Sequence, residues 1–222
     1  MRLIFIAPPG AGKGTQSALI TEKYHLPQLS TGNILRAEIK AGTPLGKSVA
    51  EYINVGEFVP DEIMIQFLED QITKDKYANG FILDGFPRTL YQAISLDRLF
   101  LKYHFKLDAV LILYVQKSEL IARLAARRTC LNCGASFHLE YKPPRVFNIC
   151  DVCGSTLTQR KDDSEESIKT RIRNYNNLTM PIIEHYDSMN LIHRIDGVGT
   201  LDQVYGRIDK VLKYLDKSGL SQ

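Results

Sequence analysis

Short apolar runs rich in branched side chains recur along the chain, and longer stretches with helical spacing separate them. The apolar runs are typical of fully buried strands and cover residues 3–7, 81–83, 109–115 and 191–195. The stretches with helical spacing cover residues 15–24, 61–74, 89–103, 118–127 and 164–186. Strands that alternate with helices predict an α/β fold, in which helices cover both faces of a parallel sheet.

Two stretches interrupt this alternation. Residues 30–59 are polar and helix-rich without a clear strand, and residues 126–163 contain Pro143-Pro144 and all four cysteines. We interpret both as insertions into a core formed by residues 1–29, 60–125 and 164–222. A chain of 222 residues is long enough for such a core. The terminal KSGLSQ is expected to be frayed.

Composition and charge are those of an ordinary globular protein. Hydrophobic residues make up 44% and charged residues 24%, and the net charge of +3 gives no general field for polyanions. No apolar run approaches the roughly 20 residues of a membrane span, and RLIFIA is too short for a signal peptide. We therefore expect a cytoplasmic protein with reduced thiols and no membrane partner.

A glycine-rich loop, APPGAGKGT at residues 7–15, joins the first apolar run to the first helical stretch. It departs from the pattern G-x-x-x-x-G-K-[ST] at Ala7 and at Gly14, which follows Lys13. A phosphate loop combines exposed backbone amides, a helix N-terminus and a lysine, and all three are expected here. We predict that Ala7 is tolerated with a negative φ. A glycine-rich turn without a ligand is the alternative.

Four motifs in order carry a wider resemblance. APPGAGKGT, STGNILR (30–36), NGFILDGFPRT (79–89) and RKDD (160–163) together resemble the adenylate kinases. That family more often has glycine at position 7 and an acidic residue at position 33, where this chain has Ala7 and Asn33. The resemblance implies a core of the P-loop NTPase type with five parallel strands, a helical monophosphate-binding insertion (30–59) and a lid (126–163). It also implies reversible, Mg²⁺-dependent transfer, ATP + AMP ⇌ 2 ADP, by a monomer.

The resemblance also assigns roles to individual residues. The residues implied for ATP are Gly10, Ala11, Gly12, Lys13, Gly14, Thr15, Arg123, Arg127, Ser136, Phe137 and Gly199. Those implied for AMP are Thr31, Arg36, Glu57, Phe58, Val59, Gly85, Phe86, Pro87, Arg88, Gln92, Arg160 and Arg171. The implied catalytic set is Lys13, Arg88, Arg123, Arg160, Arg171 and Asp84, the last of which organises the water shell of Mg²⁺.

Several details of these assignments follow from local patterns. Arg123 and Arg127 are four residues apart on a predicted helix and should share a face. Asp163 or Ser164 is predicted to cap the helix that contains Arg171. Thr31 and Gln92 offer groups that can recognise adenine; alternatively, Thr31 only caps a helix and Gln92 is solvated.

None of the motifs contains a catalytic base, and the five histidines are scattered without a nucleophile partner. A hydroxyl acceptor would need its proton removed, whereas a phosphate acceptor is already an anion at pH 7. The arginine-rich pattern therefore favours a nucleoside monophosphate as acceptor.

The four cysteines form two CxxCG motifs, Cys130–Cys133 and Cys150–Cys153, separated by sixteen residues. Two such turns present four thiolates, which predicts a structural Zn²⁺ site that leaves no position for water. Disulfides and free thiols are the alternatives. A lid of this size is too small to build a substantial core, so a metal would supply stability.

Three other functions fit part of the sequence. A zinc-ribbon nucleic-acid binder would explain the cysteines but not the glycine loop, and no stacking aromatics alternate with basic residues. Ala7 suggests an inactive nucleotide-sensing scaffold as a second alternative, but the presence of Lys13 and all six arginines argues against it. A pyrimidine monophosphate kinase is the nearest alternative. We expect ATP, AMP and ADP as partners and no nucleic acid.

Overall fold

The central element of the computed structural model, which describes residues 1–217, is a five-stranded parallel sheet. Residues 218–222, where most of the tail expected to fray is located, lie outside the described part. The strand order is β2-β3-β1-β4-β8. The strands are β1 (Arg2–Ile6), β2 (Gln28–Ser30), β3 (Phe81–Asp84), β4 (Ala109–Tyr114) and β8 (Ile192–Asp196). The predicted α/β class and the five strands implied by resemblance are confirmed.

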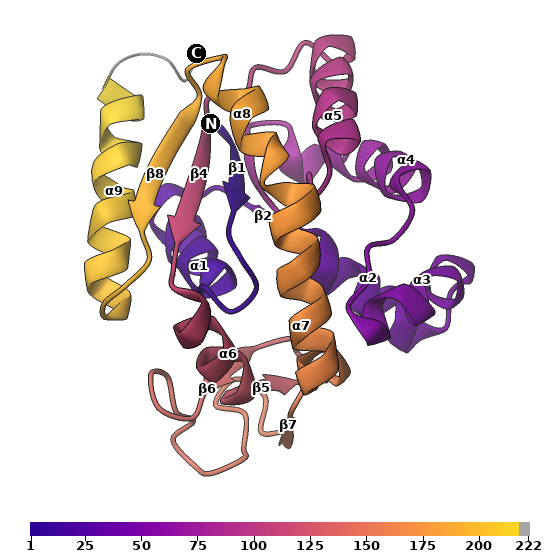
Figure 1. Cartoon of the computed structure of the whole chain (residues 1–222), viewed down its shortest axis with the longest axis vertical. Coiled ribbons are helices and arrows are strands. Elements are labelled where there is room, and N and C mark those ends of the chain that lie inside the picture. Colours follow the sequence, from indigo (N-terminus) through magenta and orange to yellow (C-terminus); the bar gives the residue numbers. More distant parts are fainter. Residues whose placement is uncertain (218–222) are drawn as a thin grey trace.

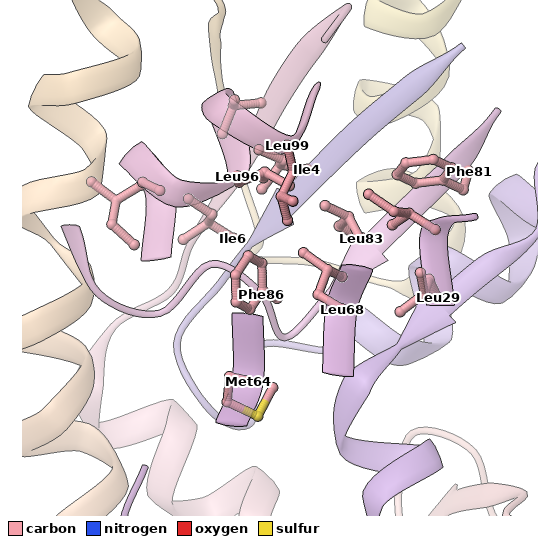
Figure 2. Close-up of a cluster of buried hydrophobic side chains, with 14 of the residues drawn as sticks. Ile4, Ile6, Leu29, Met64, Leu68, Phe81, Leu83, Phe86, Leu96 and Leu99 are labelled. Atoms are coloured by element: carbon pink, nitrogen blue, oxygen red, sulfur yellow. The ribbon is translucent and has the colours of Figure 1, made fainter. Parts of the chain in front are cut away.

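Hydrophobic side chains cover both faces of this sheet. Ile4 and Ile6 join one buried cluster, to which α4 (Asp61–Ile72), α5 (Leu90–Lys102) and α8 (Pro181–Asp187) contribute (Figure 2). Leu3 and Phe5 join the other, with α1 (Lys13–Tyr24), α6 (Lys117–Ala125) and α9 (Leu201–Lys217). Alternate residues of one strand thus point to opposite helix layers, as a doubly covered parallel sheet requires.

The carboxyl ends of the parallel strands meet at one edge. Phe5 on β1 and Ser30 on β2 are both in register with Asp84, the last residue of β3. The glycine loop follows β1 at this edge, where α/β sheets typically bind ligands.

Both predicted insertions lie next to this edge (Figure 1). The helical insertion contains α2 (Thr31–Ala41) and α3 (Pro44–Val55). These pack so closely that a Cβ at Gly46 would lie 2.1 Å from the Glu38 carbonyl oxygen. The lid contains an antiparallel sheet of β5 (Arg127–Cys130), β6 (Ser136–His138) and β7 (Leu157–Thr158).

Two of the predicted helices differ from the structure: one is shorter than predicted, and one is interrupted. The helix predicted over 118–127 ends at Ala125, and Arg127 begins β5 by pairing with His138. The expectation that Arg123 and Arg127 share a helix face is therefore wrong.

The stretch 164–186 is divided into α7 (Glu165–Asn174), a π-helical turn (Tyr175–Thr179) and α8, which begins at Pro181. Ser164 caps α7 by accepting a hydrogen bond from the Ser167 amide at 3.3 Å. Asp163 instead ends a 3₁₀ turn (Lys161–Asp163), and a second 3₁₀ turn covers Asp75–Tyr77.

Candidate functional site

A cavity of about 820 Å³ opens at the carboxyl edge of the sheet, between the glycine loop, the helical insertion and the lid. It brings together all the residues predicted to bind nucleotide except one. The exception is Phe86, which is 1% exposed and packs in the core with Met64 and Leu68 (Figure 2). The structure therefore places Phe86 in the core beside the cavity, and its part in AMP binding stays a prediction.

The glycine loop has the backbone geometry of an anion cradle. Gly10 and Gly12 have φ values of 87° and 88°, and α1 begins directly after Gly12. A side chain at Gly10 would also meet the Leu120 carbonyl oxygen at 2.8 Å. Within residues 1–217, the non-glycine residues with positive φ are His25, His104, Asn148 and Asn190. The predicted negative φ of Ala7 is confirmed.

Lys13 lies at the start of α1 and forms an ion pair with Asp84, with 2.6 Å between Nζ and Oδ1. Gln28 donates to the other carboxylate oxygen at 2.6 Å. Burial raises the pKa of Asp84, but the charge and hydrogen bond of Lys13, the charge of Arg88 and the hydrogen bond from Gln28 together outweigh it and hold the pKa below its usual value. Asp84 is thus a buried, negatively charged carboxylate, and carboxylate oxygens are ligands that Mg²⁺ prefers. Sequence reasoning missed Gln28, which no motif marks.

Three arginines around the cavity bind neutral oxygen atoms. Arg36 donates to Asn33 at 2.7 Å, Arg88 to the Gly85 carbonyl at 2.8 Å, and Arg160 to Thr129 at 2.9 Å.

Among the described residues, none of these three arginines forms an ion pair. Burial lowers the pKa of Arg88, and the charge of Arg171 lowers it further. Burial and the charge of Arg127 do the same to Arg160. Half-buried cations that face one cavity without carboxylate partners form a site for an anion.

The other three arginines that line the cavity, Arg123, Arg127 and Arg171, are held by carboxylates. Arg171 contacts Asp162 at 3.1 Å and Asp163 at 2.9 Å, and Arg127 also binds Asp163. The Asp163 side chain has no exposed surface. Arg123 pairs with Glu119 one helical turn earlier. Sequence reasoning offered Asp163 or Ser164 as a helix cap and gave Asp162 no role, although the two consecutive acids in RKDD were a visible signal.

The two residues predicted to face a base are buried. Thr31 donates to the Asp84 carbonyl at 3.4 Å and is not a cap, because Ser30 is the N-cap of α2. Gln92 is 1% exposed, donates to Asp61 and accepts from the Arg88 amide. The alternative of a capping Thr31 and a solvated Gln92 is therefore wrong.

The four cysteines converge in the lid, with all sulfur atoms within 4.8 Å of one another. The Cys130 and Cys153 sulfurs are 3.4 Å apart, and those of Cys133 and Cys150 are 3.5 Å apart. Four thiolates at about 2.3 Å from a Zn²⁺ ion would lie about 3.8 Å from one another, so the cluster fits this metal. The sulfurs are not disulfide-bonded.

Comparison with known proteins decides the family. The family model "Adenylate kinase" matches residues 5–191. An adenylate kinase of Clostridium botulinum (strain 657 / Type Ba4) is 44% identical over 212 residues, which cover 96% of this chain and 98% of the relative. Adenylate kinases of Alkaliphilus oremlandii and Archaeoglobus fulgidus are 47% and 45% identical, over 94% and 96% of this chain and 96% and 98% of their own lengths. The chain belongs to the adenylate kinase family.

Adenylate kinases are enzymes that transfer phosphate between nucleotides, so this chain is a nucleoside monophosphate kinase. Membership decides between the kinase and the zinc-ribbon nucleic-acid binder. In this member of the family, Asn33 supplies the neutral oxygen that holds Arg36. No helix within residues 1–217 is long and apolar enough to cross a membrane.

Proposed function

We propose that the protein catalyses the reversible, Mg²⁺-dependent reaction ATP + AMP ⇌ 2 ADP. The main support is one cavity that combines the glycine loop, Lys13 and three arginines without carboxylate partners. Two nucleotides that meet through their phosphates would bring the negative charge that this cluster lacks.

ATP is proposed to bind on the glycine-loop side. Backbone amides of residues 10–15 would hold its phosphates at the N-terminus of α1, with Arg123 and Arg127 beside them. The adenine would lie near Ser136, Phe137 and Gly199, which line the same cavity. Phe137 also belongs to the lid core with Cys130, Cys150 and Leu157, so it would present only part of its surface.

AMP is proposed to bind between the helical insertion and the end of β3. Arg36 and Arg88 would hold its phosphate, since they lack anionic partners. Thr31, Gln92 and the backbone of residues 57–59 would face the base, with Gly85 and Pro87 close by.

A phosphate oxygen of AMP attacks the terminal phosphorus of ATP. The bond between that phosphorus and the oxygen that bridges it to the second phosphate breaks, and the bridging oxygen leaves as part of ADP. Lys13, Arg160 and Arg171 would neutralise charge on the moving phosphoryl group. No base is required because the acceptor is already ionised. Asp84 would hold Mg²⁺ through waters, and this ion would supply further neutralisation of phosphate charge. Closure of the lid would exclude water, a competing acceptor.

The cysteine cluster is proposed to hold one structural Zn²⁺ ion, because four sulfur ligands leave no open position. We further propose a core of residues 1–29, 60–125 and 164–222, with 30–59 as the acceptor-binding insertion and 126–163 as the lid. The enzyme is proposed to act as a monomer in the cytoplasm.

A coupled assay with ATP against AMP, UMP, CMP and GMP tests the acceptor. An unpaired buried polar group costs about 1–3 kcal/mol, so we expect AMP to be preferred at least tens-fold in kcat/KM. Gln92→Ala should reduce this preference. Equal use of AMP and UMP by the wild type would favour the pyrimidine monophosphate kinase instead.

A further inference from the structure

We infer that Asp61 is a positioning residue that makes the acceptor site select a 6-amino purine over a 6-oxo purine, by fixing the orientation of the Gln92 amide. This inference rests on the proposed function, in which the acceptor base lies against Gln92. Asp61 is the first residue of α4 and appears in none of the motifs.

Two hydrogen bonds hold the Gln92 amide at opposite ends. Its Nε2 donates to Asp61 Oδ1 at 2.7 Å, and its Oε1 accepts from the Arg88 backbone N–H at 2.8 Å. A backbone N–H can only donate and a carboxylate can only accept. The opposite orientation would set two donors face to face at Arg88 and two acceptors at Asp61. With Gln92 only 1% exposed, water has little access to relieve such contacts.

Asp61 is itself anchored. Its second oxygen accepts from the Thr89 hydroxyl at 3.0 Å, and that hydroxyl accepts from the Gln92 backbone amide at 3.1 Å as the N-cap of α5. One carboxylate therefore joins the first turns of α4 and α5 and leaves the Gln92 side chain one favourable orientation.

The fixed amide still has one N–H and one lone pair free, and Gln92 lines the cavity. Adenine offers an N6 donor beside its N1 acceptor. Hypoxanthine offers the reverse, an O6 acceptor beside an N1–H donor. An amide held in one orientation can match the first pattern and opposes the second, whereas an amide free to reverse can match either.

The test compares kcat/KM for AMP and inosine monophosphate in the wild type and in two variants. Asp61→Ala removes the acceptor and leaves only the Arg88 restraint, so the AMP-to-IMP ratio should fall about tenfold or more. Asp61→Asn keeps an acceptor oxygen and should retain most of the ratio. Glu62→Ala is the matched control, because it removes an exposed carboxylate from the same helical turn. Asp61→Ser replaces Asp61→Ala if that variant does not fold.

The possible results separate the two proposals. An unchanged AMP-to-IMP ratio in folded Asp61→Ala would overturn the inference, whether or not kcat/KM falls equally with both acceptors. A ratio lost as fully in Asp61→Asn would point to charge instead of orientation and would also overturn it. Use of UMP as efficiently as AMP by the wild type would overturn the proposed function, whatever Asp61 does.

Discussion

Ala7 occupies the position at the end of β1 where phosphate loops usually have glycine. Its φ is negative, so a Cβ causes no backbone strain there. The positive φ values fall on Gly10 and Gly12, and at Gly10 the close carbonyl of Leu120 excludes a side chain as well. The residues that the loop needs as glycine are therefore still glycine, which supports a working phosphate loop.

Lys13 gives the most direct test of that loop. Lys13→Met should lower turnover by about 10²–10³-fold, because it removes a charge matched to the transferring phosphoryl group. Steady-state kinetics with ATP and AMP measure this change. A wild-type chain that binds no ATP would contradict the loop assignment. Thermal unfolding of the variant is the necessary control, since the substitution also leaves Asp84 without its cation.

Asp163 should contribute to stability, because it is a fully buried carboxylate shared by Arg127 and Arg171. Asp163→Asn leaves Arg127 without its carboxylate partner and leaves Arg171 with Asp162 alone, at a cost of about 3–5 kcal/mol. For a chain of this length each kcal/mol lowers Tm by about 2–4 °C. The exposed pair of Asp187 and Arg194 is the control, and Asp187→Asn should change Tm little. Similar Tm values for both variants would refute the role of Asp163.

At the scale of helices and strands, the sequence predicts buried segments well and junctions poorly. The apolar run 109–115 and the helical spacing at 89–103 agree with β4 and α5 to about one residue. The helix predicted over 118–127 was wrong at its end, because Arg127 pairs with His138 in the lid sheet. His138 lies outside the stretch from which the helix was predicted. Strand β2 was not predicted, since three residues are too few to show a period.

Helix α9 was absent from the predicted helical stretches although its signal was present. Val204, Ile208, Leu212 and Leu215 recur at helical spacing and are all buried. The interruption between α7 and α8 had a visible signal too, because Pro181 has no N–H for a continuous helix.

We expect the proposed Zn²⁺ ion to stabilise the lid sheet more than any other element. The apolar core of this sheet is small: Phe137, Leu157 and two cysteines. Cys130→Ser should abolish zinc binding and lower Tm more than it changes AMP affinity, since the cluster lies in the lid and outside the acceptor site. Native mass spectrometry should detect one zinc per wild-type chain. Protein purified without chelators that contains no metal would rule the site out.

At the scale of the whole molecule, the site forms from segments that are distant in sequence. Lys40 on α2 donates to the Leu131 carbonyl in the lid at 3.0 Å, so the helical insertion and the lid touch. Nearly every residue that the resemblance assigned to a nucleotide lines the cavity, but the motifs could not show that Asp163 pairs with Arg127. Such pairings depend on how the lid folds back, which no local pattern encodes.

The cavity as a whole contains more cations than carboxylates, and this surplus predicts how ligands affect stability. Three arginines have only neutral partners, so a bound polyanion should stabilise the folded state selectively. ADP at about 100 times its Kd should contribute about 2.7 kcal/mol, which raises Tm by about 5–10 °C. Adenosine, which has the base but no phosphate, should raise Tm far less, and added salt should reduce the ADP effect. Thermal unfolding with each ligand measures this, and equal stabilisation by adenosine and ADP would show that the arginine cluster does not drive binding.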